Sequence, residues 1–198
     1  VDGVASILPP FGRTTAETLL RYETIAAAVP NLPFYPYLFG GETDALSLMR
    51  TLLERIPNIG GAKYTGPDMY ELHALTQLRD EGWTIFSGMD QQCVFAAMFG
   101  ASANIGSTLN LMPGVYREIH RCCNEGDLIR ARDLQLRANR VTRVLQQHGI
   151  WGAIFEALRF LGLDCGVPRL PHAPVSPDAR FAFHESLVAA GLPELADM

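Results

Sequence analysis

Lys63 is the only lysine in the chain, and its position is unusual for a lysine. It stands near the end of the β-like run Ile59–Thr65 and not on a charged helix face. Lysine is seldom fully buried, and the end of a barrel strand directs an inward side chain to the mouth of the bore, where barrel active sites lie. Burial can lower the pKa of a lysine amine by several units, and the freed lone pair attacks ketones. The placement favours an imine-forming nucleophile over the alternative, a surface lysine at the edge of a loop.

Small residues come directly before this lysine. Gly60, Gly61 and Ala62 have little or no side chain. We therefore expect them to leave room beside the Lys63 amine for a small substrate.

Two tyrosines occupy the preceding strand. Tyr35 and Tyr37 are two positions apart, so they share one face of the strand. A phenol can shuttle a proton when a neighbouring cation or carboxylate tunes it, and Tyr37 is preferred because it lies nearer the C-terminal end of its strand. The alternative, which placement alone favours, is simple packing with the hydroxyl group in water.

Polar residues follow two further strands. The stretch Ser87–Gln92 supplies a carboxylate and an amide where a helix begins, and these groups could bind hydroxyl groups. The alternative is that Asp90 caps the helix. Gly106–Thr108 offers backbone amides and hydroxyls that suit a carboxylate or a sugar hydroxyl. No lysine follows Gly106, and the spacing from Gly100 is wrong for a phosphate-binding P-loop.

The elements that position these residues alternate between strand and helix. Helix-start signals separate the runs: Thr14 and Glu17 form a capping-box pattern, and Pro67 with Asp68 opens another helix. The near-regular alternation predicts a parallel α/β sheet with crossover helices, and favours a (β/α)8 TIM barrel. The expected strands are Val4–Leu8, Leu32–Leu38, Ile59–Thr65, Thr84–Gly88 and Ala103–Ser107.

After Pro113 the pattern predicts helices alone. One apolar stripe at helical spacing is followed by a helix over Trp151–Leu163 and a short helix near Phe181–Ala190. We therefore expect a partial (β/α) barrel over residues 1–125 and a helical extension over 126–198 packed on it. A full barrel needs eight βα units and about 250 residues, so three strands have no counterpart here. The stripe consists of Leu128, Ala131, Leu134, Ala138, Val141 and Leu145.

Composition excludes several classes of function. The 198 residues carry a net charge of −5, with arginines scattered among acids, so neither nucleic acid nor a membrane surface is an expected partner. No apolar run approaches the roughly 18 residues of a membrane span, and the start lacks signal-peptide features, so a cytoplasmic location is expected.

Cysteines and histidines do not suggest a metal site. The four cysteines, two of them adjacent at Cys122 and Cys123, fit no metal-ligand spacing and are expected to be reduced thiols. The histidines are isolated, and His120, the one nearest a cysteine pair, is expected on a helix surface.

Taken together, the motifs resemble the pyruvate-dependent aldolases that include N-acetylneuraminate lyase and dihydrodipicolinate synthase. The resemblance covers nearly the whole chain, and within the family it is nearest to the animal-type lyases, in which Gly-x-Lys, Gly-x-Asp-Glu-Gln and Gly-Ser-Thr recur in this order. It is carried by Asp2-Gly3-Val4, Leu32-Pro33-Phe34-Tyr35, Gly61-Ala62-Lys63-Tyr64-Thr65, Gly88-Met89-Asp90-Gln91-Gln92, Ile105-Gly106-Ser107-Thr108 and Pro168-Arg169-Leu170-Pro171.

The resemblance implies reversible cleavage of a sialic acid to an acylated hexosamine and pyruvate. Pyruvate would be held as an imine on Lys63, with Tyr37 moving the proton and no metal or organic cofactor required. It further implies a small-molecule keto acid or sugar acid as partner, a homotetramer, and a chain that carries strands four to eight. The substrate contacts that it implies are Thr65, Gly88, Asp90, Gln91, Gly106 and Ser107.

Three departures from the family pattern keep alternatives open. The first three strands, which grip the pyruvate carboxylate in the family, have no counterpart. The segment Leu38–Thr43 is shorter than the family's and lacks its usual proline. Gln91 stands where sialic-acid lyases usually carry glutamate, and an amide accepts a hydrogen bond less strongly than a carboxylate. The alternatives are a related aldolase for another sugar acid and a catalytically incomplete fragment.

Overall fold

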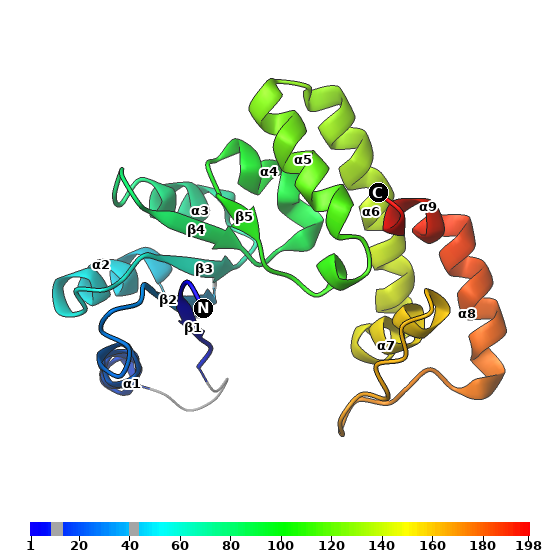
Figure 1. Ribbon diagram of the computed structural model, residues 1–198, viewed down its shortest axis with the longest axis horizontal. Helices are drawn as coiled ribbons and strands as arrows, with labels where there is room; N and C mark the ends of the chain where they lie inside the picture. The colour runs from blue at the N-terminus through cyan, green and yellow to red at the C-terminus, as the bar shows by residue number, and fades with distance from the viewer. Residues whose placement is uncertain (9–13, 40–43) are drawn as a thin grey trace. The chain divides into compact units, whose positions relative to one another are not determined.

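The computed structural model describes residues 1–8, 14–39 and 44–198 and groups them into two compact units (Figure 1). Unit 1 comprises Val1–Met89 and Phe95–Ile105. Unit 2 comprises Asp90–Val94 and Gly106–Met198. Each unit has its own apolar core.

Unit 1 is built on a five-stranded parallel sheet whose strand order follows the chain order. Each strand therefore pairs with the next through a crossover, as the sequence pattern predicts. The strands are β1 (Val4–Ser6), β2 (Phe34–Phe39), β3 (Gly61–Thr65), β4 (Thr84–Ser87) and β5 (Ala103–Asn104). The helices between them are α1 (Thr15–Ala27), α2 (Ala45–Arg55), α3 (Met69–Thr76) and α4 (Cys93–Met98), the last preceded by the 3-10 turn η1 (Asp90–Gln92).

Local signals start the helices where the sequence predicts. The Thr14 hydroxyl accepts a hydrogen bond from the Glu17 amide at 3.2 Å, and the Glu17 carboxylate accepts one from the Thr14 amide at 2.7 Å. This reciprocal pair of hydrogen bonds provides acceptors for amides that would otherwise have no partner at the start of the helix. Asp68 caps α3 by accepting from the amides of Tyr70 and Glu71. Both predicted helix starts are confirmed.

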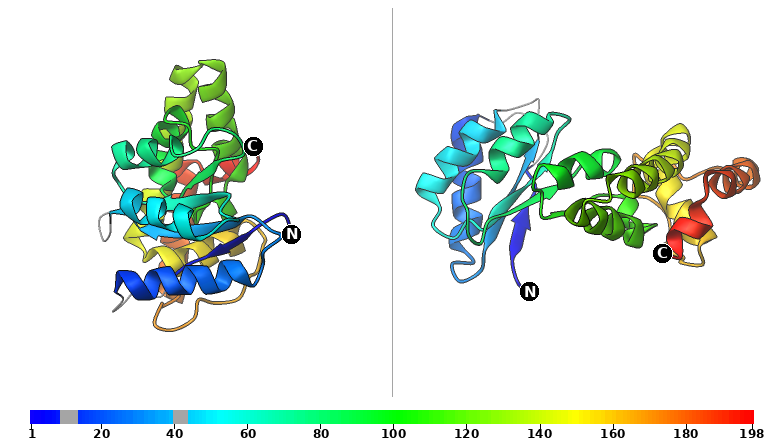
Figure 2. Two further views of the ribbon diagram at one scale, coloured as in Figure 1. Left: turned by 90° about the vertical axis from the view of Figure 1, so that its left-hand side faces the viewer. Right: turned by 90° about the horizontal axis from the view of Figure 1, so that it is seen from above.

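The core of unit 1 lies between one face of the sheet and the helices. Alternate strand residues are buried against α1, α2 and α3, and Figure 2 shows α1 and α2, in blue and cyan, along the same face of the sheet. The opposite face carries the half-buried side chains of Tyr35, Tyr37 and Lys63. The buried hydrophobic side chains of the sheet include those of Phe34, Leu38, Ala62, Tyr64 and Ile85.

Asn58 fixes the connection that leads from α1 into β2. Its side-chain amide donates to the carbonyls of Ala26, Val29 and Leu32 at 3.3, 3.0 and 3.0 Å. The Asn58 carbonyl also accepts from the amide of Phe34 at 2.8 Å. Since buried or partly buried carbonyls need partners, this one residue sets where β2 begins.

The strands are shorter than the sequence suggests. β5 ends at Asn104 and not at Ser107, because the chain turns into a second 3-10 segment, η2 (Thr108–Asn110). Ile105 still donates to the carbonyl of Ser87 at 2.9 Å, after which the ladder stops. The predicted strand over Val4–Leu8 likewise ends at Ser6.

Unit 2 is helical. The predicted stripe lies along α6 and is buried except at its first residue, Leu128, which is 43% exposed because it occupies the first helical position. The last long helix begins at Pro177, ahead of the predicted Phe181, because proline suits the first turn of a helix. The helices are α5 (Pro113–Glu125), α6 (Leu128–Gln147), α7 (Ile150–Phe160), α8 (Pro177–Ala190) and α9 (Leu192–Ala196).

The compact units differ from the division expected between residues 125 and 126, because unit 2 also contains Asp90–Val94 and the chain from Gly106 onward. Here α5 groups with the later helices, because Val115, Tyr116 and Ile119 share an apolar core with α6. The predicted division into a partial barrel over residues 1–125 and a helical extension over residues 126–198 stays a prediction.

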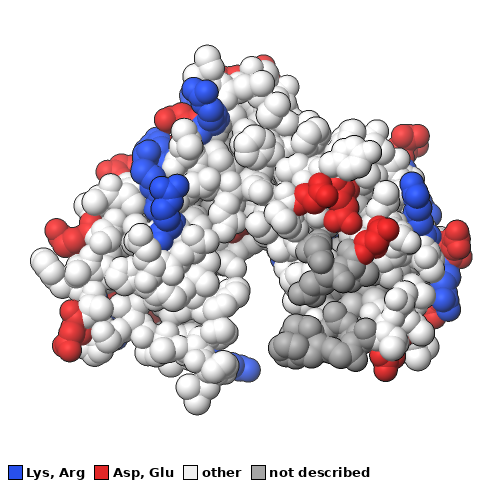
Figure 3. Space-filling model, turned by 180° about the vertical axis from the view of Figure 1, so that it is seen from behind, with Lys and Arg blue, Asp and Glu red and all other residues white. Residues whose placement is uncertain are grey.

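Surface charge and helix length agree with the composition. On the face drawn in Figure 3, each unit carries acidic and basic side chains together. Within the described ranges, no helix combines the length and the apolar character that crossing a membrane requires.

Candidate active site

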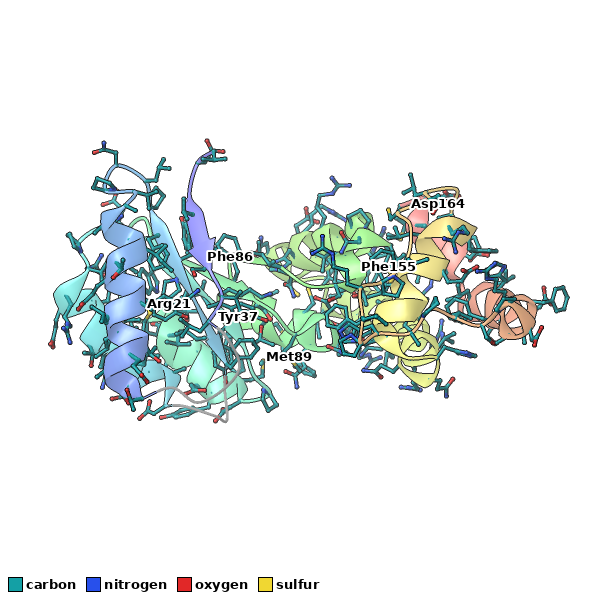
Figure 4. All side chains as sticks on the ribbon, turned by 90° about the horizontal axis from the view of Figure 1, so that it is seen from below. Arg21, Tyr37, Phe86, Met89, Phe155 and Asp164 are labelled. Atoms are coloured by element: carbon teal, nitrogen blue, oxygen red, sulfur yellow. The ribbon has the colours of Figure 1, made fainter. Side chains whose placement is uncertain are left out.

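Lys63 and Tyr37 lie opposite each other in the ladder between β2 and β3. Residues directly opposite in a ladder project to the same face, and here the Lys63 amine lies 4.1 Å from the centroid of the Tyr37 ring. An ammonium group over an aromatic face is attracted by the ring quadrupole. The same register places Phe86 of β4 beside Lys63, and Figure 4 shows Tyr37 and Phe86 on the side of the sheet away from α1. The structure thus brings the two predicted catalytic side chains together.

The Tyr37 phenol is held on two sides. The Thr65 hydroxyl donates to its oxygen at 3.0 Å, and the Phe39 ring stacks on its ring with centroids 4.3 Å apart. Because Thr65 supplies the donor, the phenolic proton can point toward a ligand. Residues 40–43 of the segment after Tyr37, where the sequence departs from the family pattern, lie outside the described residues.

Gly88 gives the lysine its room. A Cβ atom at position 88 would lie 1.8 Å from the Thr65 hydroxyl oxygen and 2.8 Å from Cε of Lys63. Any larger residue would therefore push into both side chains. The expectation that Gly60 and Gly61 provide this room is wrong, because their absent side chains accommodate the Tyr35 ring and the Thr84 backbone instead.

A cavity of about 290 Å³ lies beside Lys63 within unit 1. Tyr35 and Phe86 line it together with the start of the chain, and their rings meet edge to face at 5.5 Å. The lining is mainly apolar, as in most small-molecule sites, and Lys63 places one basic group in it. The remaining lining residues are Asp2, Gly3, Val4, Ala5 and Ile105.

Tyr64 anchors β3 from its other face, a role that was not predicted from the sequence. Its buried hydroxyl donates to the Glu71 carboxylate at 2.6 Å, and the same carboxylate accepts from the amide of Ala45 at 2.9 Å. Burial and this hydrogen bond raise the pKa of Tyr64 well above its usual value. The tie fixes the strand that carries Lys63. The only sequence signal is a tyrosine with a carboxylate seven residues later.

Asp90 and Gly106 meet within unit 2. Asp90 is buried, and its carboxylate accepts from the amide and the hydroxyl of Thr108 at 2.9 and 2.7 Å. The Thr108 hydroxyl is also 2.6 Å from the Tyr116 hydroxyl. A Cβ atom at Gly106 would lie 1.5 Å from a carboxylate oxygen of Asp90, so only glycine fits there. Asp90 therefore ties two parts of the chain together.

Gln91 and Ser107 are half-buried residues of the predicted substrate-binding set, and both belong to unit 2. The Gln91 carbonyl accepts from the Asn139 side chain at 3.1 Å. The Ser107 carbonyl accepts from Asn110 at 2.9 Å. In both residues the backbone is held while the side chain keeps access to the surface.

Glu156 is the centre of a group of ion pairs in unit 2. The buried Glu156 carboxylate pairs with Arg159, Arg180 and His184 at 2.7, 3.3 and 3.0 Å. All four cysteines are free thiols, and among the residues that the structure describes no group of three His, Cys, Asp or Glu side chains could hold a metal ion. His120 is half-buried rather than on the helix surface, and burial lowers its pKa.

Comparison with known proteins identifies the family. The model of the dihydrodipicolinate synthetase family matches residues 1–190. This chain belongs to that family. Solved structures with a similar fold confirm the fold class predicted from the sequence, a partial (β/α)8 barrel with further helices. One of them is an N-acetylneuraminate lyase from Aliivibrio salmonicida, which is 27% identical to this chain. The match covers 95% of this chain and 64% of that one, with a TM-score of 0.86.

Curated proteins similar to this chain include N-acetylneuraminate lyases. N-acetylneuraminate lyase of Rhizobium meliloti (strain 1021) is 31% identical over 186 residues, which are 92% of this chain and 61% of that protein. The lyase of Homo sapiens is 29% identical over 86% of this chain and 56% of its own length. The chain thus spans about three-fifths of the length of the curated relatives that it matches.

Proposed function

We propose that the chain carries the imine-forming part of a class I aldolase that reversibly cleaves N-acetylneuraminate to N-acetylmannosamine and pyruvate. The observation that carries the proposal is the amine of the single lysine over the Tyr37 ring, beside a small apolar cavity. Membership of the family and similarity to N-acetylneuraminate lyases support it. No metal or organic cofactor takes part in the proposed reaction.

The reaction begins when the neutral Lys63 amine attacks the C2 ketone of the open-chain sugar acid. Loss of water from the carbinolamine gives an iminium ion, which accepts the electron pair of the breaking carbon–carbon bond and becomes an enamine. The hydroxyl group on the departing fragment loses its proton and becomes the aldehyde of N-acetylmannosamine. Protonation of the enamine carbon and hydrolysis of the imine release pyruvate and restore the amine.

In this scheme Tyr37 moves the proton. Its hydroxyl is oriented by Thr65 and its ring contacts the lysine amine, so one side chain reaches both the hydrogen-bond network and the nucleophile. General acid–base catalysis by a positioned group contributes typically 10²–10⁴-fold in rate. Thr65 and Gly88 support the site by holding the phenol and by leaving room for the amine.

Further substrate contacts are proposed from the family motifs. These motifs assign Asp90, Gln91, Gly106 and Ser107 to the substrate, with Asp90 and Gln91 facing its polyhydroxy part. For Asp90 the assignment stays a prediction, because its carboxylate already accepts two hydrogen bonds from Thr108. A tetrameric assembly and a cytoplasmic location likewise stay predictions.

A second candidate function is a related pyruvate aldolase that acts on another sugar acid. Gln91 favours it, since an amide replaces the usual carboxylate of sialic-acid lyases. Pyruvate release from a panel of keto sugar acids separates the two. Release from another acid, with none from N-acetylneuraminate, would support the second candidate.

Reductive trapping tests the shared chemistry. Incubating the folded chain with pyruvate and borohydride should add one reduced pyruvyl group to Lys63, located by peptide mass spectrometry. Lys63→Arg keeps the positive charge and should give no adduct. Tyr37→Phe should still form the adduct, but cleavage should fall by about 10²–10⁴-fold. A folded wild-type chain without an adduct on Lys63 would contradict the proposal.

A further inference from the structure

Helix α6 carries a buried amide that the mechanism does not use. Gln135 is 4% exposed and lies among the apolar residues of the α6 stripe. An amide buried in such surroundings is costly unless its donors and acceptor are satisfied. The partners of Gln135 therefore indicate what it does.

Gln135 spans the turn that contains the predicted substrate-binding residues Asp90 and Gln91. Its side-chain oxygen accepts from the amide of Val94 at 2.9 Å, and its nitrogen donates to the carbonyl of Asp90 at 3.1 Å. A backbone amide can only donate and a carbonyl can only accept, so the orientation of the Gln135 side chain follows from its partners. The Gln135 side chain thus holds both ends of the turn, at Asp90 and at Val94.

Asn139 extends the same contact by one residue. It lies four positions after Gln135, hence on the same face of α6. Its side-chain nitrogen donates to the carbonyl of Gln91 at 3.1 Å, and its oxygen accepts from the nitrogen of Gln135 at 3.0 Å. Two consecutive carbonyls of the turn, those of Asp90 and Gln91, are thus held by two coupled amides.

The turn is fixed from a second direction as well. Thr108 donates twice to the Asp90 carboxylate, and Gly106 packs directly against that carboxylate. The backbone of Asp90 is held by α6 while its side chain is held by the segment before α5. Gln91, whose side chain is half-buried, therefore projects from a backbone with little freedom to adjust.

We propose that Gln135 and Asn139 are positioning residues that set the selectivity for the polyhydroxy part of the substrate by fixing the backbone of Asp90 and Gln91. The inference rests on the proposed aldolase function, and on the assignment of Gln91 to the sugar end. It separates two steps: imine formation depends on Lys63 and its neighbours in unit 1, whereas recognition of the sugar depends on the α6 amides.

The test replaces each donor with an isosteric carboxylate. Gln135→Glu keeps an acceptor for the Val94 amide but loses the donor to the Asp90 carbonyl. Asn139→Asp makes the same change at a half-buried and more tolerant position. Gln146→Glu is the matched control, because Gln146 is an exposed glutamine on the same helix.

In both test variants the KM for the sugar acid should rise about tenfold, the effect of losing one such hydrogen bond. The yield of pyruvate trapped on Lys63 should match that of the wild type, and the control should match it in both measurements. Hydrogen exchange at residues 90–94 should quicken in the test variants alone.

Three outcomes overturn the inference in distinguishable ways. An unchanged KM in both variants, with normal pyruvate trapping, overturns the inference and leaves the proposed function intact. A parallel loss of trapping and of sugar-acid affinity indicates general destabilisation, which also overturns it. A wild-type chain that traps no pyruvate, or cleaves no sugar acid, overturns the proposed function and the inference with it.

Discussion

Thr65 and Gly88 lie close to the side chain of Lys63, the proposed nucleophile. The Thr65 hydroxyl orients Tyr37, while the bare Cα of Gly88 lets both the threonine and the lysine side chain pass. Lys63 can be singled out from the sequence because it is the only lysine. Its neighbours on adjacent strands depend on the register in which the strands pair. The sequence therefore identifies Lys63 and Tyr37 as a pair and misassigns the glycines that give them room.

Gly88→Ala tests this contact. The added methyl group would lie 1.8 Å from the Thr65 hydroxyl oxygen, so Thr65 must move and its hydrogen bond to Tyr37 must lengthen or break. Overpacking of this kind costs about 1–3 kcal/mol of stability. We expect a lower midpoint in thermal unfolding and slower trapping of pyruvate on Lys63.

Thr65→Val is the companion variant, because it removes the hydroxyl without adding an atom at position 88. If the damage acts through the bond to Tyr37, this variant should also slow the trapping of pyruvate on Lys63, with a smaller loss of stability. Normal stability and normal trapping in Gly88→Ala would show that the site can relax around the methyl group.

At the scale of elements, features that depend on nearby residues can be predicted from the sequence. Features that depend on contacts between distant residues cannot. The caps at Thr14 and Asp68 and the alternation in β2 depend on residues a few positions apart, so a sequence pattern predicts them. The early end of β5 and the role of Gln135 depend on partners tens of residues away. Nothing in the spacing along the chain indicates such contacts before the fold is known.

The tie between Tyr64 and Glu71 makes β3 sensitive to alkaline pH. An unfolded tyrosine ionises near pH 10, whereas burial and the Glu71 carboxylate raise the pKa of Tyr64 in the folded chain above that value. The unfolded state therefore releases its proton first. The stabilisation is fully present below pH 10 and is lost as the pH rises above it.

Tyr64→Phe should make stability less dependent on pH above 10 than it is in the wild type. At neutral pH the variant should lose about 1–3 kcal/mol, because one oxygen of Glu71 loses its donor. Urea unfolding at several pH values measures both effects, and groups common to the two proteins cancel. A parallel pH dependence in variant and wild type would rule out this role for Tyr64.

At the scale of the whole molecule, β1 and β5 lie at the two ends of the strand order and form the edges of the sheet among the residues that the structure describes. Strands at a sheet edge present unpaired amides and carbonyls that can pair with another chain. The repeat of strand and helix was enough to predict the barrel class and the shortfall of strands. Assembly was not predictable from it, because it depends on what meets these edges.

The 198-residue chain on its own should therefore associate in solution. Light scattering coupled to size exclusion should show species larger than a monomer, growing with protein concentration. Ile7→Lys places a charge just after β1, at a residue that is 56% exposed, and should reduce the association. A monodisperse monomer with cooperative unfolding would contradict this expectation.

Asn58 holds the connection between α1 and β2 through backbone atoms, so the side chains of that connection are under little constraint. It holds the carbonyls of Ala26, Val29 and Leu32, and carbonyls are the same in every amino acid. The identities of residues 28–31 are therefore free to drift during evolution, while position 58 must keep an amide that reaches all three. In a family tree of this chain, the variable turn and the fixed asparagine should appear together.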